Sequence, residues 1–249
     1  MKYSACIESL FKGNDFIERL KVVNSIGIKT FEFWAWWNKD IHQIKKAKEE
    51  LGMNVSAFCT MKGSLVDPSK RAEYLDGLKE SIAVAKDLDC RNLISLVGNE
   101  IEGVAREEQN KSLVEGLKAC APIVEQSGIS LLVEPLNTLV NHKGYYLYSS
   151  DEAFEIIENV GSSNVKILFD IYHQQITEGH LISRICSNIG KIGHFHAAGN
   201  PGRHELTDGE INYPEIFKAI EKTGYNGFIG LEYFPLRDVV EGLKETVSL

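Results

Sequence analysis

The chain has few features that would point to a membrane, secreted or nucleic-acid-binding protein. Among its 249 residues, no apolar run reaches the ~18 residues needed to span a bilayer. The first residues, Met1 to Ile7, become polar too soon for a signal peptide. The formal net charge of −8 disfavours a broad surface for the phosphate backbone of nucleic acids. We therefore expect a soluble, cytoplasmic protein with neither membrane nor nucleic acid as a partner.

The spacing of the cysteines also does not indicate a disulfide framework or a zinc site. The cysteines are odd in number, widely spaced and without a C-x-x-C pair. They predict buried free thiols in a reducing compartment. The five are Cys6, Cys59, Cys90, Cys120 and Cys186.

An alternation of strand-like and helix-like segments is present instead. Strands are expected at roughly 3–8, 30–35, 54–60, 92–98, 130–136, 165–171, 192–198 and 228–234. Amphipathic helices are expected near 14–26, 40–51, 70–88, 104–127, 150–160, 178–188, 212–223 and 237–247. No G-x-G-x-x-G follows the first strand, so a dinucleotide-binding fold is disfavoured. Eight β/α units predict an α/β fold, a single (β/α)₈ TIM barrel over residues 1–249.

Local signals support several of these segments. Tyr74, Leu78, Ile82 and Ala85 recur at the spacing of one buried helical face. Ser149 offers an N-cap for the helix at 150–160. Four glycines stand where a helix C-cap is expected, namely Gly27, Gly52, Gly128 and Gly224. Two connections, 137–148 and 199–212, look longer than a turn, and long loops often carry specificity.

Four potential metal ligands lie near the ends of separate apolar runs. Glu134, Asp170 and Glu232 each end such a run, and His196 lies in another. In a barrel, catalytic groups come from the ends of several strands at one face. Three carboxylates and one imidazole make a mostly oxygen site that suits Mn²⁺ or Mg²⁺. The sequence therefore predicts one divalent ion bound at the barrel mouth.

The same ligands indicate proton transfer on a small oxygenated substrate. The ion would polarise a carbonyl and stabilise the enediolate formed when the neighbouring carbon loses a proton. Glu134 and Glu232 could be the catalytic pair, one abstracting the proton and the other delivering it to the adjacent carbon. A single strand-end acid would more often be structural, so this hypothesis depends on all four groups together.

Further residues are expected around this mouth. His173 is predicted on the loop just past its strand, as a donor to a substrate oxygen or as a surface histidine. Arg203 could hold a carboxylate through its guanidinium fork, with His204 beside it. His194 shares the strand face of His196 one layer deeper, as a core group or an additional ligand.

The segment 33–37 contains every tryptophan in the chain. Trp34 and its two neighbours, Trp36 and Trp37, follow the second strand, where they could form an apolar wall or lid that excludes water. Core packing or a subunit interface is an equally good interpretation. We count Trp34 among the expected substrate contacts.

These residues give the chain a resemblance to the hydroxypyruvate isomerase family of the xylose isomerase-like TIM-barrel superfamily. Gly-Arg-His-Glu at 202–205 and Asp-Gly-Glu-Ile-Asn-Tyr at 208–213 are typical of that family. Val-Glu-Pro-Leu-Asn at 133–137 and Asp-Ile-Tyr-His at 170–173 are shared with ketose 3-epimerases. Gly-Leu-Glu-Tyr at 230–233 fits both groups.

The resemblance implies an isomerase that converts hydroxypyruvate to tartronate semialdehyde. It implies Glu134, Asp170, His196 and Glu232 as ligands of one Mn²⁺ or Mg²⁺ ion, and two of them, Glu134 and Glu232, as the acid/base pair. It implies substrate contacts from His173 and Arg203, and a homo-oligomer, a dimer or tetramer.

Other functions remain open at this stage. A ketose 3-epimerase of the D-tagatose or D-psicose kind is favoured by His196 and disfavoured by Val140, which stands where such enzymes have a sugar-binding glutamate. A phosphodiesterase of the endonuclease IV type needs extra histidines, but segments 59–62 and 97–100 have none. A non-catalytic sugar-binding barrel would keep the ligands without turnover.

Overall fold

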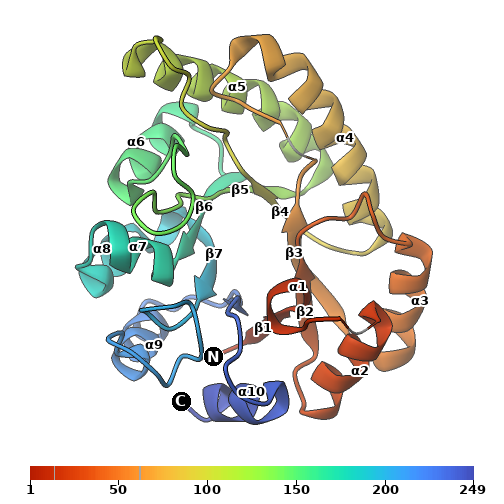
Figure 1. Ribbon diagram of the computed structural model, residues 1–249. Helices are drawn as coiled ribbons and strands as arrows, with labels where there is room; N and C mark the ends of the chain where they lie inside the picture. The colour runs from red at the N-terminus through yellow and green to blue at the C-terminus, as the bar shows by residue number, and fades with distance from the viewer. Residues whose placement is uncertain (14, 62) are drawn as a thin grey trace.

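A computed structural model describes residues 1–13, 15–61 and 63–249 of the chain. Its eight strands are parallel, follow one another in sequence order and close into a barrel, with β8 paired to β1 (Figure 1). They are β1 (Tyr3–Cys6), β2 (Thr30–Phe33), β3 (Asn54–Cys59), β4 (Asn92–Ser95), β5 (Ser130–Val133), β6 (Val165–Asp170), β7 (Ile192–Ala197) and β8 (Ile229–Leu231). The predicted single-domain (β/α)₈ barrel is confirmed.

The helices form a ring outside the strands (Figure 1). They are α1 (Ile7–Leu10), α2 (Phe16–Ser25), α3 (Ile41–Leu51), α4 (Arg71–Asp87), α5 (Arg106–Ser127), α6 (Ser150–Val160), α7 (Ile171–Thr177), α8 (Leu181–Asn188), α9 (Tyr213–Lys222) and α10 (Val239–Val247). All eight expected helical segments are present. The one expected at 14–26 starts at a position outside the described residues, and its described part is α2.

Helix boundaries follow the local signals in the sequence. The four apolar residues of α4 that predicted one face, from Tyr74 to Ala85, are all buried. Gly52 and Gly128 are left-handed C-caps, and Gly27 and Gly224 follow their C-caps with positive φ. Ser149 accepts a hydrogen bond from the backbone N–H of Glu152 at the start of α6.

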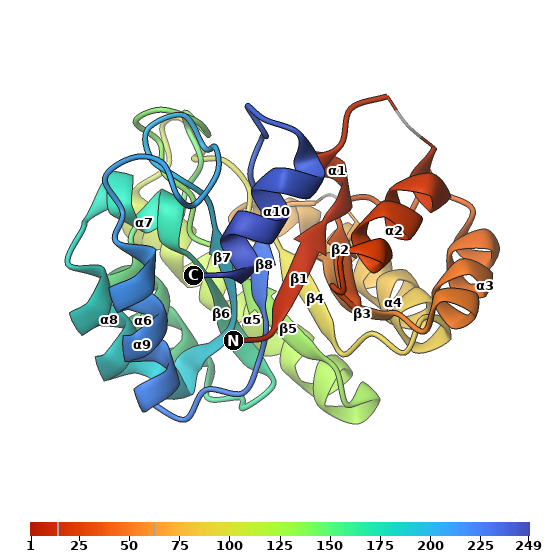
Figure 2. The ribbon, with the colours of Figure 1, turned by 90° about the horizontal axis from the view of Figure 1, so that it is seen from below.

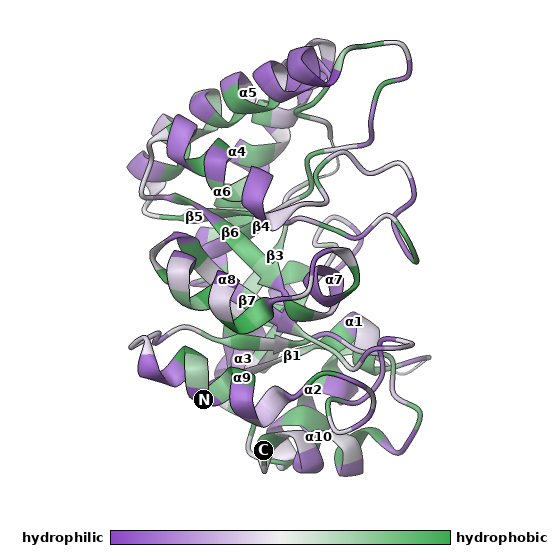
Figure 3. Ribbon diagram, turned by 90° about the vertical axis from the view of Figure 1, so that its left-hand side faces the viewer, coloured by the Kyte–Doolittle hydropathy of each residue, from purple (hydrophilic) through white to green (hydrophobic). Residues whose placement is uncertain are grey.

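The barrel interior has an apolar side and a polar side. Ala57, Ile94, Leu132 and Leu168 form a small buried cluster inside β3 to β6. Across from this cluster, β2 and β7 contribute Glu32, His194 and His196, all fully or almost fully buried. In Figure 3 the strands are mostly green, whereas the outer helices carry most of the purple. The polar side of the interior leads to the mouth described below.

The loops that follow the strands gather at one end of the barrel (Figure 2). The two longest expected connections, after β5 and β7, rise above this mouth. Short helices α1 and α7 begin directly after β1 and β6, where the sequence predicted longer strands. Asp170 explains α7, because its Oδ1 accepts hydrogen bonds from the N–H groups of Tyr172 and His173. His173 therefore lies on a helix and not on a loop.

The thiols differ from expectation at one position. All five cysteines are free, and Cys6, Cys90 and Cys120 are buried, with Cys59 half-buried. Cys186 is exposed, so the prediction of burial was wrong there. Its neighbour Ile185 lies on the buried face of α8, which leaves Cys186 off that face. In the described part of the chain, no helix is long and apolar enough to cross a membrane.

Candidate metal and proton-transfer site

The barrel closure brings the four predicted ligands together. Asp170 and His196 are register partners on β6 and β7, while Glu134 and Glu232 are the first residues after β5 and β8. Each offers one ligand atom, and these atoms all lie within 4.8 Å of one another. All four side chains are buried. A cluster separated along the sequence is thus assembled at one point of the mouth.

This cluster fits a divalent cation. His196 Nδ1 lies 2.9 Å from Glu232 Oε2 and 3.4 Å from Glu134 Oε1. Nδ1 is nevertheless buried without a hydrogen-bond partner among the described residues. A buried polar atom of this kind is expected to have a partner, and a metal ion between the imidazole and the carboxylates would provide one. The four residues could therefore hold an ion, and their oxygen-rich set suits Mn²⁺ or Mg²⁺.

The two glutamates have opposite electrostatic environments. Burial, together with the nearby Glu232 and Asp170 carboxylates, raises the pKa of Glu134 to about 7, although His196 opposes this shift. Burial alone would also raise the pKa of Glu232. The charges of His196 and Arg203 outweigh it and hold the pKa of Glu232 well below its ordinary value. Two carboxyl groups of opposed proton affinity in one site are a typical acid/base arrangement.

Arg203 reaches the ligands from the loop after β7. Its Nη2 donates to Asp170 Oδ2 at 3.0 Å and to Glu232 Oε2. Its Nε donates to the backbone oxygen of Glu232 at 3.3 Å. The two oxygens of Asp170 therefore have different roles, because Oδ1 caps α7 and Oδ2 faces the site. Arg203 has a φ of 60° and is held in the mouth as the sequence suggested.

His173 is buried beside Asp170, and its protonation is fixed by Asn137. His173 Nδ1 lies 2.6 Å from Asn137 Nδ2 and 3.3 Å from the Asn137 backbone N–H. Asn137 Oδ1 already accepts from the N–H groups of Val140 and Asn141, so its Nδ2 is the atom that donates to the ring. His173 Nδ1 must therefore be the acceptor, and Nε2 carries the proton. Burial also lowers the pKa of His173 to about 3, which keeps it neutral.

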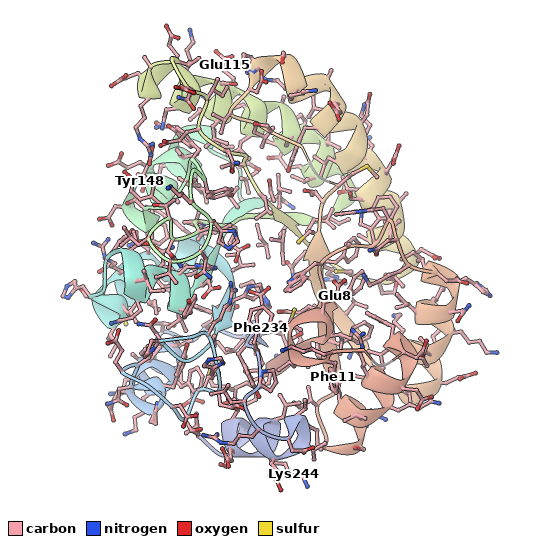
Figure 4. The ribbon with its side chains drawn as sticks, in the orientation of Figure 1. Glu8, Phe11, Glu115, Tyr148, Phe234 and Lys244 are labelled. Carbon is pink, nitrogen blue, oxygen red and sulfur yellow. The ribbon has the colours of Figure 1, made fainter. Side chains whose placement is uncertain are left out.

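The three tryptophans do not form one apolar wall, and His204 has a structural contact of its own. Trp34 donates its indole N–H to Glu232 Oε1, so it borders the site. Trp36 instead donates to Ser81 on α4, and Trp37 is exposed. His204 bonds through Nδ1 to the backbone oxygen of Phe234, which is labelled near the barrel centre in Figure 4. His204 thus joins two mouth loops, and within the described residues no hydrogen bond or ion pair links it to the four predicted ligands.

Two residues near the site were not singled out from the sequence. Glu32 lies 2.9 Å from Nε2 of both His194 and His196. Its neighbours Phe31 and Phe33 make the local pattern look like an ordinary strand with one polar residue, so nothing local marked it. Asn137 was part of the motif at 133–137, but its bond to His173 depends on a contact between segments far apart in sequence.

Comparisons with known proteins show the family of the chain. The family described as "Xylose isomerase-like TIM barrel" matches residues 20–248. Hydroxypyruvate isomerase of Escherichia coli strain K12 is 33% identical, over 98% of this chain and 97% of the relative. A 2-oxo-tetronate isomerase of Cupriavidus necator is 26% identical, over 97% and 96%.

A solved structure from Brucella melitensis, described as "AP endonuclease, family 2", superposes with a TM-score of 0.94 at 29% identity, covering 99% of this chain and 98% of that one. A D-psicose 3-epimerase from Clostridium cellulolyticum H10 has a TM-score of 0.85 at 19% identity, covering 100% and 97%, and this likeness shows the fold alone. The full-length match to isomerases above 30% identity decides the family. The chain is an isomerase and belongs to the hydroxypyruvate isomerase family of xylose isomerase-like TIM barrels.

Proposed function

We propose that this protein is a metal-dependent isomerase of a small 2-oxo acid, with hydroxypyruvate and tartronate semialdehyde as its substrate pair. The relatives named for hydroxypyruvate and 2-oxo-tetronate support the substrate class. The observation that carries the proposal is the pair Glu134 and Glu232, both buried and both within 3.4 Å of Nδ1 of His196.

The reaction moves two hydrogens and changes no other atom. One glutamate takes a proton from C3 of hydroxypyruvate, and the electrons of that bond form the C2–C3 double bond of an enediolate. A proton delivered to C2 by the other glutamate, with the hydroxyl proton passing from the C3 oxygen to the C2 oxygen, gives tartronate semialdehyde. A divalent ion held by Glu134, Asp170, His196 and Glu232 would supply positive charge beside these oxygens.

The remaining groups of the site would orient the substrate. His173 presents Nε2–H, which makes no hydrogen bond among the described residues and lies 3.5 Å from Asp170 Oδ2. It can donate to a substrate oxygen. Arg203 uses Nη2 for the carboxylates of Asp170 and Glu232 and Nε for the backbone oxygen of Glu232, so Nη1 is the atom we assign to the substrate carboxylate. Trp34 covers one oxygen of Glu232 and limits water on that side.

Proton NMR in D₂O with Mg²⁺-loaded protein tests the proposal. The panel contains hydroxypyruvate, a four-carbon 2-oxo acid and several free ketoses. We expect product and deuterium incorporation with the acids alone. Glu134→Gln and Glu232→Gln should each lower turnover by at least about 100-fold, since each removes a general acid or base. Glu178→Gln is the control, because Glu178 is a half-buried carboxylate that pairs with Arg184 and makes no hydrogen bond or ion pair with the four predicted ligands among the described residues.

Two outcomes would contradict the proposal. Near-normal turnover in either active-site variant would exclude the two-carboxylate mechanism. Exchange at C3 of ketoses with the acids inert would instead identify a ketose 3-epimerase. Val140, 66% exposed, does not provide the sugar-binding group expected of such an enzyme.

A further inference from the structure

Glu32 lies inside the barrel, one layer below the four ligands, and has no role in the proton transfer described above. It comes from β2 and is 1% exposed. Its Oε2 accepts the hydroxyl of Ser56 at 3.0 Å and lies 2.9 Å from Nε2 of His194. Its Oε1 lies 2.9 Å from Nε2 of His196. One carboxylate thus contacts both histidines of β7.

The two oxygens of Glu32 have different surroundings. Oε2 has two partners, and Ser56 in turn contacts Ser4 Oγ at 2.6 Å, which links the carboxylate to β3 and β1. Oε1 and His196 Nε2 are both buried and lie 2.9 Å apart, and among the described residues neither has a hydrogen-bond partner, so this close contact is the polar contact that each atom has. Oε1 therefore faces His196 alone. The contacts of Oε2 with Ser56 and His194 hold the carboxylate in this orientation.

The opposite edge of the His196 ring faces the metal site. A carboxylate only accepts hydrogen bonds, so a histidine that faces one through Nε2 carries its proton there. Nδ1 also faces carboxylates, because Glu134 and Glu232 lie 3.4 Å and 2.9 Å from it, so its lone pair becomes available when a cation replaces a proton between them. A histidine must offer such a lone pair to bind a metal, and a carboxylate on its other nitrogen commonly fixes this orientation.

The neighbouring strand leaves room for this contact. Gly230 of β8 is the register partner of His196. A Cβ atom at this position would overlap Oε1 of Glu32 and the ring of His196. The absence of a side chain is therefore needed for Glu32 and His196 to meet, and this observation is independent of the contacts themselves.

We propose that Glu32 is a positioning residue that holds His196 with Nε2 protonated and Nδ1 aimed at the metal ion. The inference deepens the proposed function and rests on it, because it requires the metal site. Glu32 touches neither substrate nor ion in this arrangement and acts through His196.

Binding of Mn²⁺ to metal-free protein tests the proposal, with the free ion measured by its electron paramagnetic resonance signal. We expect Glu32→Gln, which keeps the shape of the side chain, to weaken Mn²⁺ binding by about 10- to 100-fold. The matched control is Glu178→Gln, because Glu178 is a half-buried carboxylate that accepts from Ser150 and pairs with Arg184. This variant should bind Mn²⁺ within about twofold of the unmodified protein, because none of the four predicted ligands contacts Glu178 in the described part of the chain.

A second measurement needs no folded Glu32 variant. Long-range proton–nitrogen NMR of the Mg²⁺-loaded protein reads which nitrogen of His196 is protonated, with the signal assigned by its loss in His196→Gln. We expect the proton on Nε2. A proton on Nδ1, or unchanged Mn²⁺ affinity in Glu32→Gln, would overturn the role of Glu32 alone. Unmodified protein that binds no Mn²⁺ would overturn the metal-dependent function and this inference with it.

Discussion

At the scale of single residues, the site depends on which atoms of each polar side chain are already bonded. Asn137 is the clearest case, because its oxygen is held by the N–H groups of Val140 and Asn141. Its nitrogen is thereby directed at His173, and the histidine has one possible tautomer. A side chain outside the reacting groups thus decides where a catalytic-site proton resides.

Asn137→Asp should reverse this preference. An aspartate accepts a hydrogen bond where asparagine donates, so the proton of His173 would move to Nδ1 and Nε2 could no longer donate to the substrate. A lost hydrogen bond of about 1.5–3 kcal/mol corresponds to roughly a 10- to 100-fold fall in kcat/KM. The control is Asn141→Asp, since Asn141 uses its side-chain oxygen as an acceptor from Asn137 and Tyr172. Equal losses in both variants would refute the tautomer argument.

At the scale of elements, the ends of the strands differ in what they provide. β6 passes directly into α7, so Asp170 caps a helix and faces the site at once. β7 supplies two histidines from one face, separated by Phe195, which packs outward against Phe169 and Tyr225. In β8, Gly230 has no side chain, which leaves room for Glu32 to contact His196. The strands therefore supply Asp170 and His196, while residues that follow the strands supply Glu134 and Glu232.

Gly230→Ala tests this view of β8. The added methyl would overlap Glu32 and His196, and overpacking of this kind typically costs about 1–3 kcal/mol of unfolding free energy. We expect a lower Tm and weaker Mn²⁺ binding, measured by thermal unfolding at several Mn²⁺ concentrations. Gly190→Ala is the control, because nothing lies within 4 Å of its added Cβ. If the two variants were equally stable, the close packing around Gly230 would be disproved.

At the scale of the whole molecule, the barrel concentrates negative charge at its mouth. Three buried carboxylates of the ligand set meet there, with Arg203 and His196 as the nearby basic groups. Carboxylates brought together out of water destabilise a fold unless a cation balances them. A bound divalent ion should therefore stabilise the entire barrel. The expected dimer or tetramer remains a prediction.

Removal and return of the metal should shift thermal unfolding. At an ion concentration 100 times the dissociation constant, binding to the folded state adds about 2.7 kcal/mol, or roughly 5–10 °C in Tm for a chain of this size. We expect the Tm of chelator-treated protein to rise with Mn²⁺ or Mg²⁺. The shift should vanish in Asp170→Asn. A Tm insensitive to every divalent ion would argue against a metal at these residues.

The sequence by itself determined the alternation of strands and helices and the helix caps, because periodicity and turn chemistry are set by neighbouring residues. It also pointed to the four side chains that meet at the mouth, because each lies at or near the end of an apolar run. The sequence did not mark Glu32 as part of the site, because Phe-Glu-Phe has the pattern of any half-buried strand. Only the closure of the barrel turns Glu32 inward. The tertiary structure likewise decided that Trp34 meets Glu232, that His204 joins two loops, and that Asn137 meets His173. These contacts join segments far apart in the chain, and strand register and ring closure, which no local pattern encodes, bring them together.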